Sequence, residues 1–145
     1  DRVLRPGGVF AAICYFRPEV DDKIDALVGD LYGAENVRRF WYPGFRHVEE
    51  GYRNLPMPFG AAPQVRQFEM GAERSFAEFR GYLCTWPHVA AGFRSGEAKF
   101  IRRALGEIKV AWGGERLRRK VSWQVTVRVV VKHPEPGGVL SVGVS

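Results

Sequence analysis

The sequence predicts an α/β domain, and three patterns of apolar residues carry this prediction. Residues 9–16 form a continuous apolar run after a Pro-Gly-Gly turn, which is typical of a strand buried on both faces. Two stretches, residues 20–33 and 97–112, repeat apolar residues at helical spacing. Residues 121–131 alternate valine or tryptophan with polar residues over most of their length, which indicates a further strand.

The composition fits one globular domain. The chain has 145 residues, of which 46% are hydrophobic and 26% are charged, close to ordinary globular proteins. It contains no apolar run of the roughly 18 to 20 residues that a membrane helix needs, so we expect no membrane partner. No secretory signal is visible, and the two cysteines read as free thiols in a reducing compartment, which predicts a cytoplasmic protein.

The first helical stretch, residues 20–33, places aspartates in its first turns, where they face the positive end of the helix dipole. A second helix, residues 75–86, begins with a capping box of Ser75 and Glu78 and is stopped by Pro87. The third helix, residues 97–112, is followed by two glycines that end it.

The segments between these helices are less regular. Residues 36–63 are rich in aromatic residues and proline, and long loops of this kind often form lids or binding walls. Residues 64–70 alternate weakly and predict a short strand. Near the end of the chain, residues 139–144 are read as a short strand or a frayed tail.

The net charge of +6 comes mostly from arginine, which raises the question of nucleic-acid binding. The basic residues are scattered, and the densest run, residues 116–120, directly precedes a predicted strand. We read this run as a solvated loop at the sheet edge. Because no RNA-binding aromatic signature, phosphate loop or zinc spacing accompanies it, we expect no nucleic-acid partner; a basic nucleic-acid binder remains the weakest alternative.

Four segments, in order, resemble a known family. Residues 4–11 (LRPGGVFA) resemble the turn before the fifth strand of class I S-adenosylmethionine-dependent methyltransferases. Residues 49–59 (EEGYRNLPMPF) and 79–86 (FRGYLCTW) resemble stretches of the type 11 subgroup related to trans-aconitate methyltransferase and the plant embryo-abundant proteins. The pair AWGG at 111–114 and VSW at 121–123 resembles the close of that subgroup.

This resemblance implies the C-terminal half of a Rossmann-like methyltransferase fold. Residues 1–132 would supply strands five to seven, with the last strand antiparallel between the other two, and residues 133–145 would be a tail or a short extra strand. The family's glycine-rich cofactor loop and ribose-binding acidic residue are absent from this sequence and would precede Asp1. We therefore expect a fragment of an enzyme, with a missing N-terminal half that binds S-adenosylmethionine, no cofactor-binding residue in this chain and no activity on its own.

The complete protein would methylate a small molecule, with a carboxylic acid as one candidate class. Tyr15 ends the first strand, where open α/β sheets bind ligands, and Arg46 or Arg53 could pair with an acidic substrate group. Tyr82 and Trp86 suit either core or pocket. No metal-ligand spacing is present, and no catalytic residue is assigned, although His88 is a candidate base. The residues expected to bind substrate are Tyr15, Trp41, Tyr42, Arg46, Tyr52, Tyr82 and Trp86.

A non-catalytic interaction module derived from a methyltransferase is the alternative to an enzyme. It would bind a partner through its exposed sheet edge, because unpaired strand edges invite association. Self-association through this edge as a discrete dimer, or a heteromer, would favour this alternative, and a polydisperse aggregate would favour an orphaned half.

Overall fold

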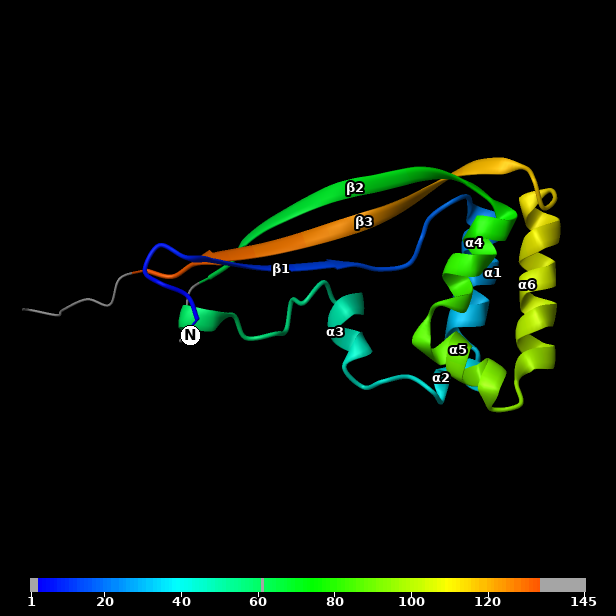
Figure 1. The fold of residues 1–145 in the computed structure, drawn as a ribbon, viewed down its shortest axis with the longest axis horizontal. Helices are drawn as coiled ribbons and strands as arrows, with labels where there is room; N and C mark the ends of the chain where they lie inside the picture. The colour runs from blue at the N-terminus through cyan, green and yellow to red at the C-terminus, as the bar shows by residue number, and fades with distance from the viewer. Residues whose placement is uncertain (1–2, 61, 134–145) are drawn as a thin grey trace, which may run out of the picture.

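The structure, a computed structural model, describes residues 3–60 and 62–133. The described residues form three strands, four longer helices and three short helical segments. Figure 1 shows their arrangement. In chain order the elements are β1 (Val9–Tyr15), α1 (Asp22–Gly33), α2 (Glu35–Arg38), α3 (Phe45–Glu49), η1 (Pro58–Gly60), β2 (Gln64–Ser75), α4 (Phe76–Cys84), α5 (Pro87–Arg94), α6 (Ala98–Trp112) and β3 (Arg118–Val131).

The three strands form one antiparallel sheet in the order β1-β3-β2. The register pairs Val9 with Val131 on one side of β3 and Gln64 with Val129 on the other. The last strand of the described chain therefore lies between the two earlier ones and runs antiparallel to both, in the order that the family resemblance implies. The predicted strand at residues 139–144 lies outside the described residues.

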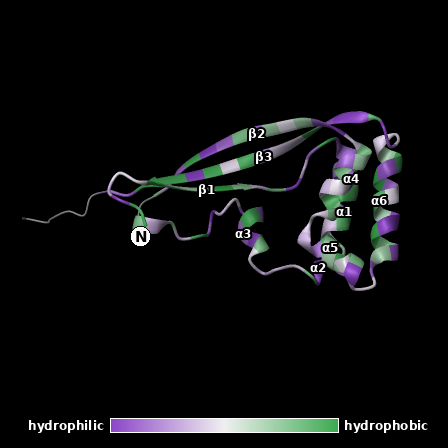
Figure 2. Cartoon of the chain, viewed as in Figure 1, coloured by the Kyte–Doolittle hydropathy of each residue, from purple (hydrophilic) through white to green (hydrophobic). Residues whose placement is uncertain are grey.

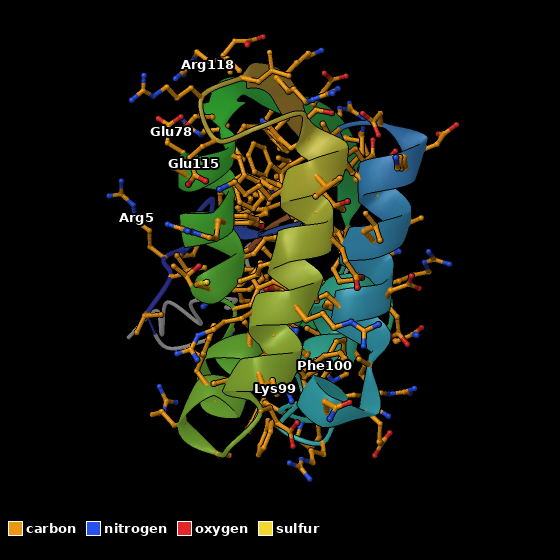
Figure 3. The ribbon with its side chains drawn as sticks, turned by 90° about the vertical axis from the view of Figure 1, so that its right-hand side faces the viewer. Arg5, Glu78, Lys99, Phe100, Glu115 and Arg118 are labelled. Carbon is orange, nitrogen blue, oxygen red and sulfur yellow. The ribbon has the colours of Figure 1, made fainter. Side chains whose placement is uncertain are left out.

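The helices α1, α2, α4, α5 and α6 gather at one end of this long sheet, and the rest of the sheet extends away from them, with α3 and η1 lying along it (Figure 1). Seen from the helical end, α6 lies in front, between α4 and α1, and charged side chains such as Lys99 and Glu115 project outward (Figure 3). The buried core lies among these helices and the first part of β3. Its largest fully buried side chains include Trp112, Phe76 and Phe79.

The local signals for the helices are confirmed. Asp21 caps α1 by accepting a hydrogen bond from the amide of Ile24 at 2.9 Å. The hydroxyl of Ser75 accepts from the amide of Glu78, whose carboxylate accepts from the amide of Ser75 at 2.7 Å, which completes the capping box. Gly113 ends α6 with a φ of 92°, a left-handed conformation that glycine adopts without steric cost.

Three boundaries differ from the prediction. The second predicted helix ends at Cys84, and Pro87 begins α5, because proline is well suited to the first helical position, where no amide donor is needed. The strand predicted at residues 64–70 continues to Ser75 because β3 pairs with it throughout. The basic run at residues 116–120 was expected to be a loop, but its last three residues belong to β3, which begins at Arg118.

The basic side chains at the start of β3 are neutralised by carboxylates from other elements. Figure 3 shows Arg118 and Glu78 at the same end of the helical layer. The three ion pairs are Arg118–Glu78 at 3.2 Å, Arg119–Asp21 at 3.0 Å and Lys120–Glu69 at 2.7 Å.

The expectation that the first strand is buried on both faces is wrong. Only Cys14 in β1 is buried, and Ile13 is 59% exposed. The reason is that β1 has one neighbouring strand, and the helices α1, α2, α4, α5 and α6 pack at the end of the sheet beyond β1 (Figures 1 and 2). Strand alternation puts several side chains on one face, which we call the bare apolar face: the exposed Val9, Ile13, Phe68 and Val131 and the partly exposed Val125, Val127 and Val129.

Replacing Trp112 by alanine should destabilise the fold by about 3 to 5 kcal/mol, because the ring is fully buried. It stacks on Phe79 with ring centres 4.9 Å apart, and its indole N–H donates to the carbonyl of Leu117 at 2.7 Å. Urea unfolding measures the change. Val110→Ala, on the exposed face of the same helix, is the control and should cost less than about 0.5 kcal/mol. Equal effects of the two substitutions would contradict this core.

Candidate functional site

An aromatic cavity of about 270 Å³ lies where β1 ends. It is bounded by the residues that follow the strand, by α1 and α3, and by the junction of α4 and α5. The aromatic cavity is lined by Tyr15, Phe16, Arg17, Tyr32, Phe45, Val48, Tyr82, Thr85, Trp86, Pro87 and His88. Most of these side chains are aromatic, as is common in small-molecule sites.

Tyr32, near the end of α1, organises the wall of this cavity. Its ring makes edge-on contacts with Phe16 at 5.3 Å, Trp86 at 5.5 Å and Trp41 at 4.5 Å between ring centres. Its hydroxyl donates to the carboxylate of Glu49 at 3.0 Å. Burial, with a further effect of the Glu49 charge, raises the pKa of Tyr32 well above its ordinary value, so this hydroxyl stays protonated.

His88, the second residue of α5, is held among aromatic rings. Its ring centre lies 5.3 Å from that of Tyr32, 5.4 Å from Trp41 and 5.6 Å from Trp86. The side chain is only 2% exposed, and its Nε2 has no hydrogen-bond partner in the described chain. Burial lowers the pKa of His88 to about 4, so the imidazole is neutral near pH 7.

Three of the residues expected to bind substrate line the aromatic cavity: Tyr15, Tyr82 and Trp86. Tyr82 also belongs to the sheet contact, because its hydroxyl accepts from the indole N–H of Trp123 at 3.1 Å. Trp41 lies behind the cavity wall, against Tyr32 and His88. Tyr82 therefore lies both at the cavity wall and against the core, so each of the two interpretations is correct in part.

The structure does not bring the other expected residues into the aromatic cavity. Tyr42 is 74% exposed, and Arg46 is exposed on α3. Tyr52 lies in the loop after α3, where its carbonyl accepts from Arg128. Arg53 lines a different, polar cavity on the other side of Phe16. An aromatic residue in a long loop was a weak guide here, because the loop turns several of these side chains outward.

Arg17 and Tyr32 are residues of the cavity that the sequence did not single out. The guanidinium of Arg17 lies 5.3 Å from the ring centre of Phe16 and 5.5 Å from that of Tyr32. Its position two residues after the end of β1 was an available signal, since strand ends line ligand sites in open α/β sheets. Tyr32 lies on the apolar stripe of α1 and gave no such signal.

The cavity can bind and orient an apolar or aromatic small molecule, with one cation at its edge and a neutral imidazole in its wall. It does not fit S-adenosylmethionine, because its volume is at the small end for ligand pockets and its lining holds no carboxylate for ribose hydroxyls. No three metal-binding side chains converge in residues 3–60 and 62–133. Within the same ranges, no helix has the length and apolar content that crossing a bilayer requires.

A comparison with solved structures finds a related protein, the "Putative Type II Methyltransferase" from Anaeromyxobacter dehalogenans. The two are 36% identical and superpose with a TM-score of 0.79 over 92% of this chain. The chain spans 56% of the length of that protein. No protein family model and no curated protein matches the present chain. The α/β architecture described above is therefore a methyltransferase-like fold.

The buried neutral histidine makes stability depend on pH. Because the folded chain binds the His88 proton with a pKa of about 4 and the unfolded chain with a pKa near 6.5, the unfolded chain holds more protons between these values. Lowering the pH from 7 to 5 should therefore cost about 2 kcal/mol of unfolding free energy through this residue. Urea unfolding at the two pH values measures it.

The variant His88→Gln should lose this part of the pH dependence, whereas His133→Gln, which replaces an exposed histidine, should keep it. If the wild-type chain and His88→Gln lost equal stability between pH 7 and pH 5, His88 would titrate normally and the buried position would be wrong.

Proposed function

We propose that this chain supplies the substrate-side part of an S-adenosylmethionine-dependent methyltransferase that acts on a small molecule. The observation that carries the proposal is the 36% identity with the Anaeromyxobacter protein along 92% of this chain. Four sequence segments support it as well: residues 4–11 resemble class I methyltransferases, and the other three resemble the type 11 subgroup. On this proposal, residues 1–132 form the C-terminal half of the methyltransferase domain. The tail from residue 133 lies beyond the part that the family shares.

The aromatic cavity is the proposed acceptor site. Flat aromatic walls bind an apolar substrate with little loss of side-chain entropy, exclude water and hold the acceptor atom in one orientation. Tyr15, Tyr82 and Trp86 supply three of these walls. His88 stays neutral at pH 7 and is too weak a base to ionise an alcohol or phenol, so its proposed role is to orient a polar group of the substrate.

The cofactor would be held by another part of the complete protein. When bound, S-adenosylmethionine supplies the methyl group, and the residues described here contribute the pocket that receives the acceptor. Two features support a preceding segment: the chain spans 56% of the related protein, and β1 leaves an unpaired edge and a bare apolar face. Burial of such a face is worth roughly 25 cal/mol for each Å² of apolar surface removed from water.

The isolated chain should therefore bind S-adenosylmethionine too weakly to detect at micromolar concentrations. Isothermal titration of the chain with the cofactor measures this, and the positive control is the same chain extended by the coding sequence upstream of Asp1. Micromolar affinity of the isolated chain would contradict the proposed division, and absence of binding by the extended chain would contradict the methyltransferase proposal itself.

An interaction module without catalysis is the second candidate, and the bare apolar face favours it. A module would use this face to form a discrete dimer, whereas an orphaned half would aggregate without a defined size. Gel filtration with light scattering should show a broad distribution that the double substitution Ile13→Lys and Phe68→Lys narrows. The control Val110→Lys adds a charge on α6 and should change nothing. A sharp wild-type dimer would favour the module.

A further inference from the structure

A second, polar cavity adjoins the aromatic cavity. It has a volume of about 400 Å³ and shares Tyr15, Phe16 and Val48 with its neighbour. The polar cavity lies between the sheet and the loop that follows α3, on the face opposite to the bare apolar face. Its other lining residues are Cys14, Glu49, Glu50, Gly51, Arg53, Val65, Gln67, Gln124, Thr126 and Arg128.

Arg128 is the unusual member of this lining. Its side chain projects from the central strand, it is 9% exposed, and no carboxylate of the described chain forms an ion pair with it. A buried charge is costly unless an opposite charge or several hydrogen bonds compensate it. The polar cavity thus holds a buried positive charge that the described residues leave without a counter-ion.

The hydrogen bonds of Arg128 show which nitrogen of the guanidinium is available. Nη1 donates to the carbonyl of Tyr52 at 2.6 Å. Nε has no partner in the described part of the chain, but it is buried and a ligand cannot reach it. Nη2 is not among the buried atoms that lack a partner, and no hydrogen bond within the described residues engages it. The contact with Tyr52 therefore holds the guanidinium in place and leaves Nη2 to donate to an anionic oxygen.

The two acidic residues of the lining are engaged elsewhere. Glu49 is exposed and accepts from the hydroxyl of Tyr32, and Glu50 accepts from the side-chain amide of Asn54 at 2.8 Å. The lining therefore carries two carboxylates and two guanidinium groups, Arg53 and Arg128, and Arg128 is the only buried group of the four. Thr126, Gln67 and Gln124 add neutral hydrogen-bonding groups. The buried charge is thus positive, and an anionic oxygen group would compensate it.

We propose that Arg128 binds the carboxylate of the acceptor substrate in the polar cavity, while the apolar body of the same molecule occupies the aromatic cavity. The shared wall of Tyr15, Phe16 and Val48 places the two parts of such a molecule next to each other. The assignment of this ligand as a methyl acceptor rests on the proposed function; the anion site itself rests on the buried arginine. The substrate class is then a small organic acid with an aromatic or apolar body.

The test compares 3-phenylpropanoate with its neutral amide, 3-phenylpropanamide, by isothermal titration of the full 145-residue chain. The acid should bind at least about tenfold more tightly, because a hydrogen bond to a charged partner is stronger than one to a neutral partner. Arg128→Gln should abolish this preference and leave the affinity for the amide unchanged, and Arg128→Lys should keep part of it. Arg66→Gln, an exposed arginine on β2 that lines neither cavity, is the matched control.

Equal binding of acid and amide to the wild-type chain would overturn the proposal, as would a preference for the acid that survives in Arg128→Gln. Should Arg128→Gln fail to fold, the thermal midpoint of the wild-type chain decides: the acid must raise it and the amide must not. Methyl transfer by the extended chain is measured separately. Acid preference without methyl transfer would overturn the proposed function alone, and methyl transfer without acid preference would overturn the anion site alone.

Discussion

The pairing of β3 with both other strands is the constraint on which the structure depends. All seven residues of β1 and all twelve of β2 find their partners on β3. The same strand carries Trp123, which reaches the helices through Tyr82, and Arg128, which holds the loop at Tyr52. Because β3 lies near the C-terminal end of the sequence, the sheet and both cavities can form only after nearly all of the described chain is available.

Periodicity predicted the elements whose opposite faces differ in polarity. Helix α6 presents Ile101, Leu105 and Ile108 to the core, and β3 alternates between its two faces, so both could be recognised from spacing alone. The strand β1 shows the limit of this reasoning. Its apolar run correctly predicted a strand, but exposure depends on which neighbours cover it, and the covering elements are not encoded in the run itself.

The candidate site was predictable where sequence position implied spatial position. Tyr15 could be placed at the ligand-binding edge because it ends a strand, whereas the sequence left Trp86, the N-cap of α5, open between core and pocket. Tyr32 could not, since a tyrosine on an apolar helical stripe is indistinguishable from core. Arg128 is a similar case: it occupies a polar position in an alternating strand, and only the loop folded over it makes that position buried.

The two cavities divide the chemistry of recognition between them. One presents rings and a neutral imidazole, and the other presents a buried guanidinium with amides, a hydroxyl and more exposed charged side chains. A molecule that fills only the aromatic cavity would leave the charge of Arg128 without a counter-ion. A molecule that fills only the polar cavity would leave the aromatic cavity hydrated. Selectivity in such a site comes from the penalty for a missing group as much as from the attraction of a present one.

The uncovered side of the sheet has a consequence for the life of the polypeptide in a cell. A broad water-facing surface of valine, isoleucine and phenylalanine resembles what chaperones and quality-control proteases recognise on incompletely folded proteins. Any segment or partner that covers this surface would therefore also protect the polypeptide from such recognition.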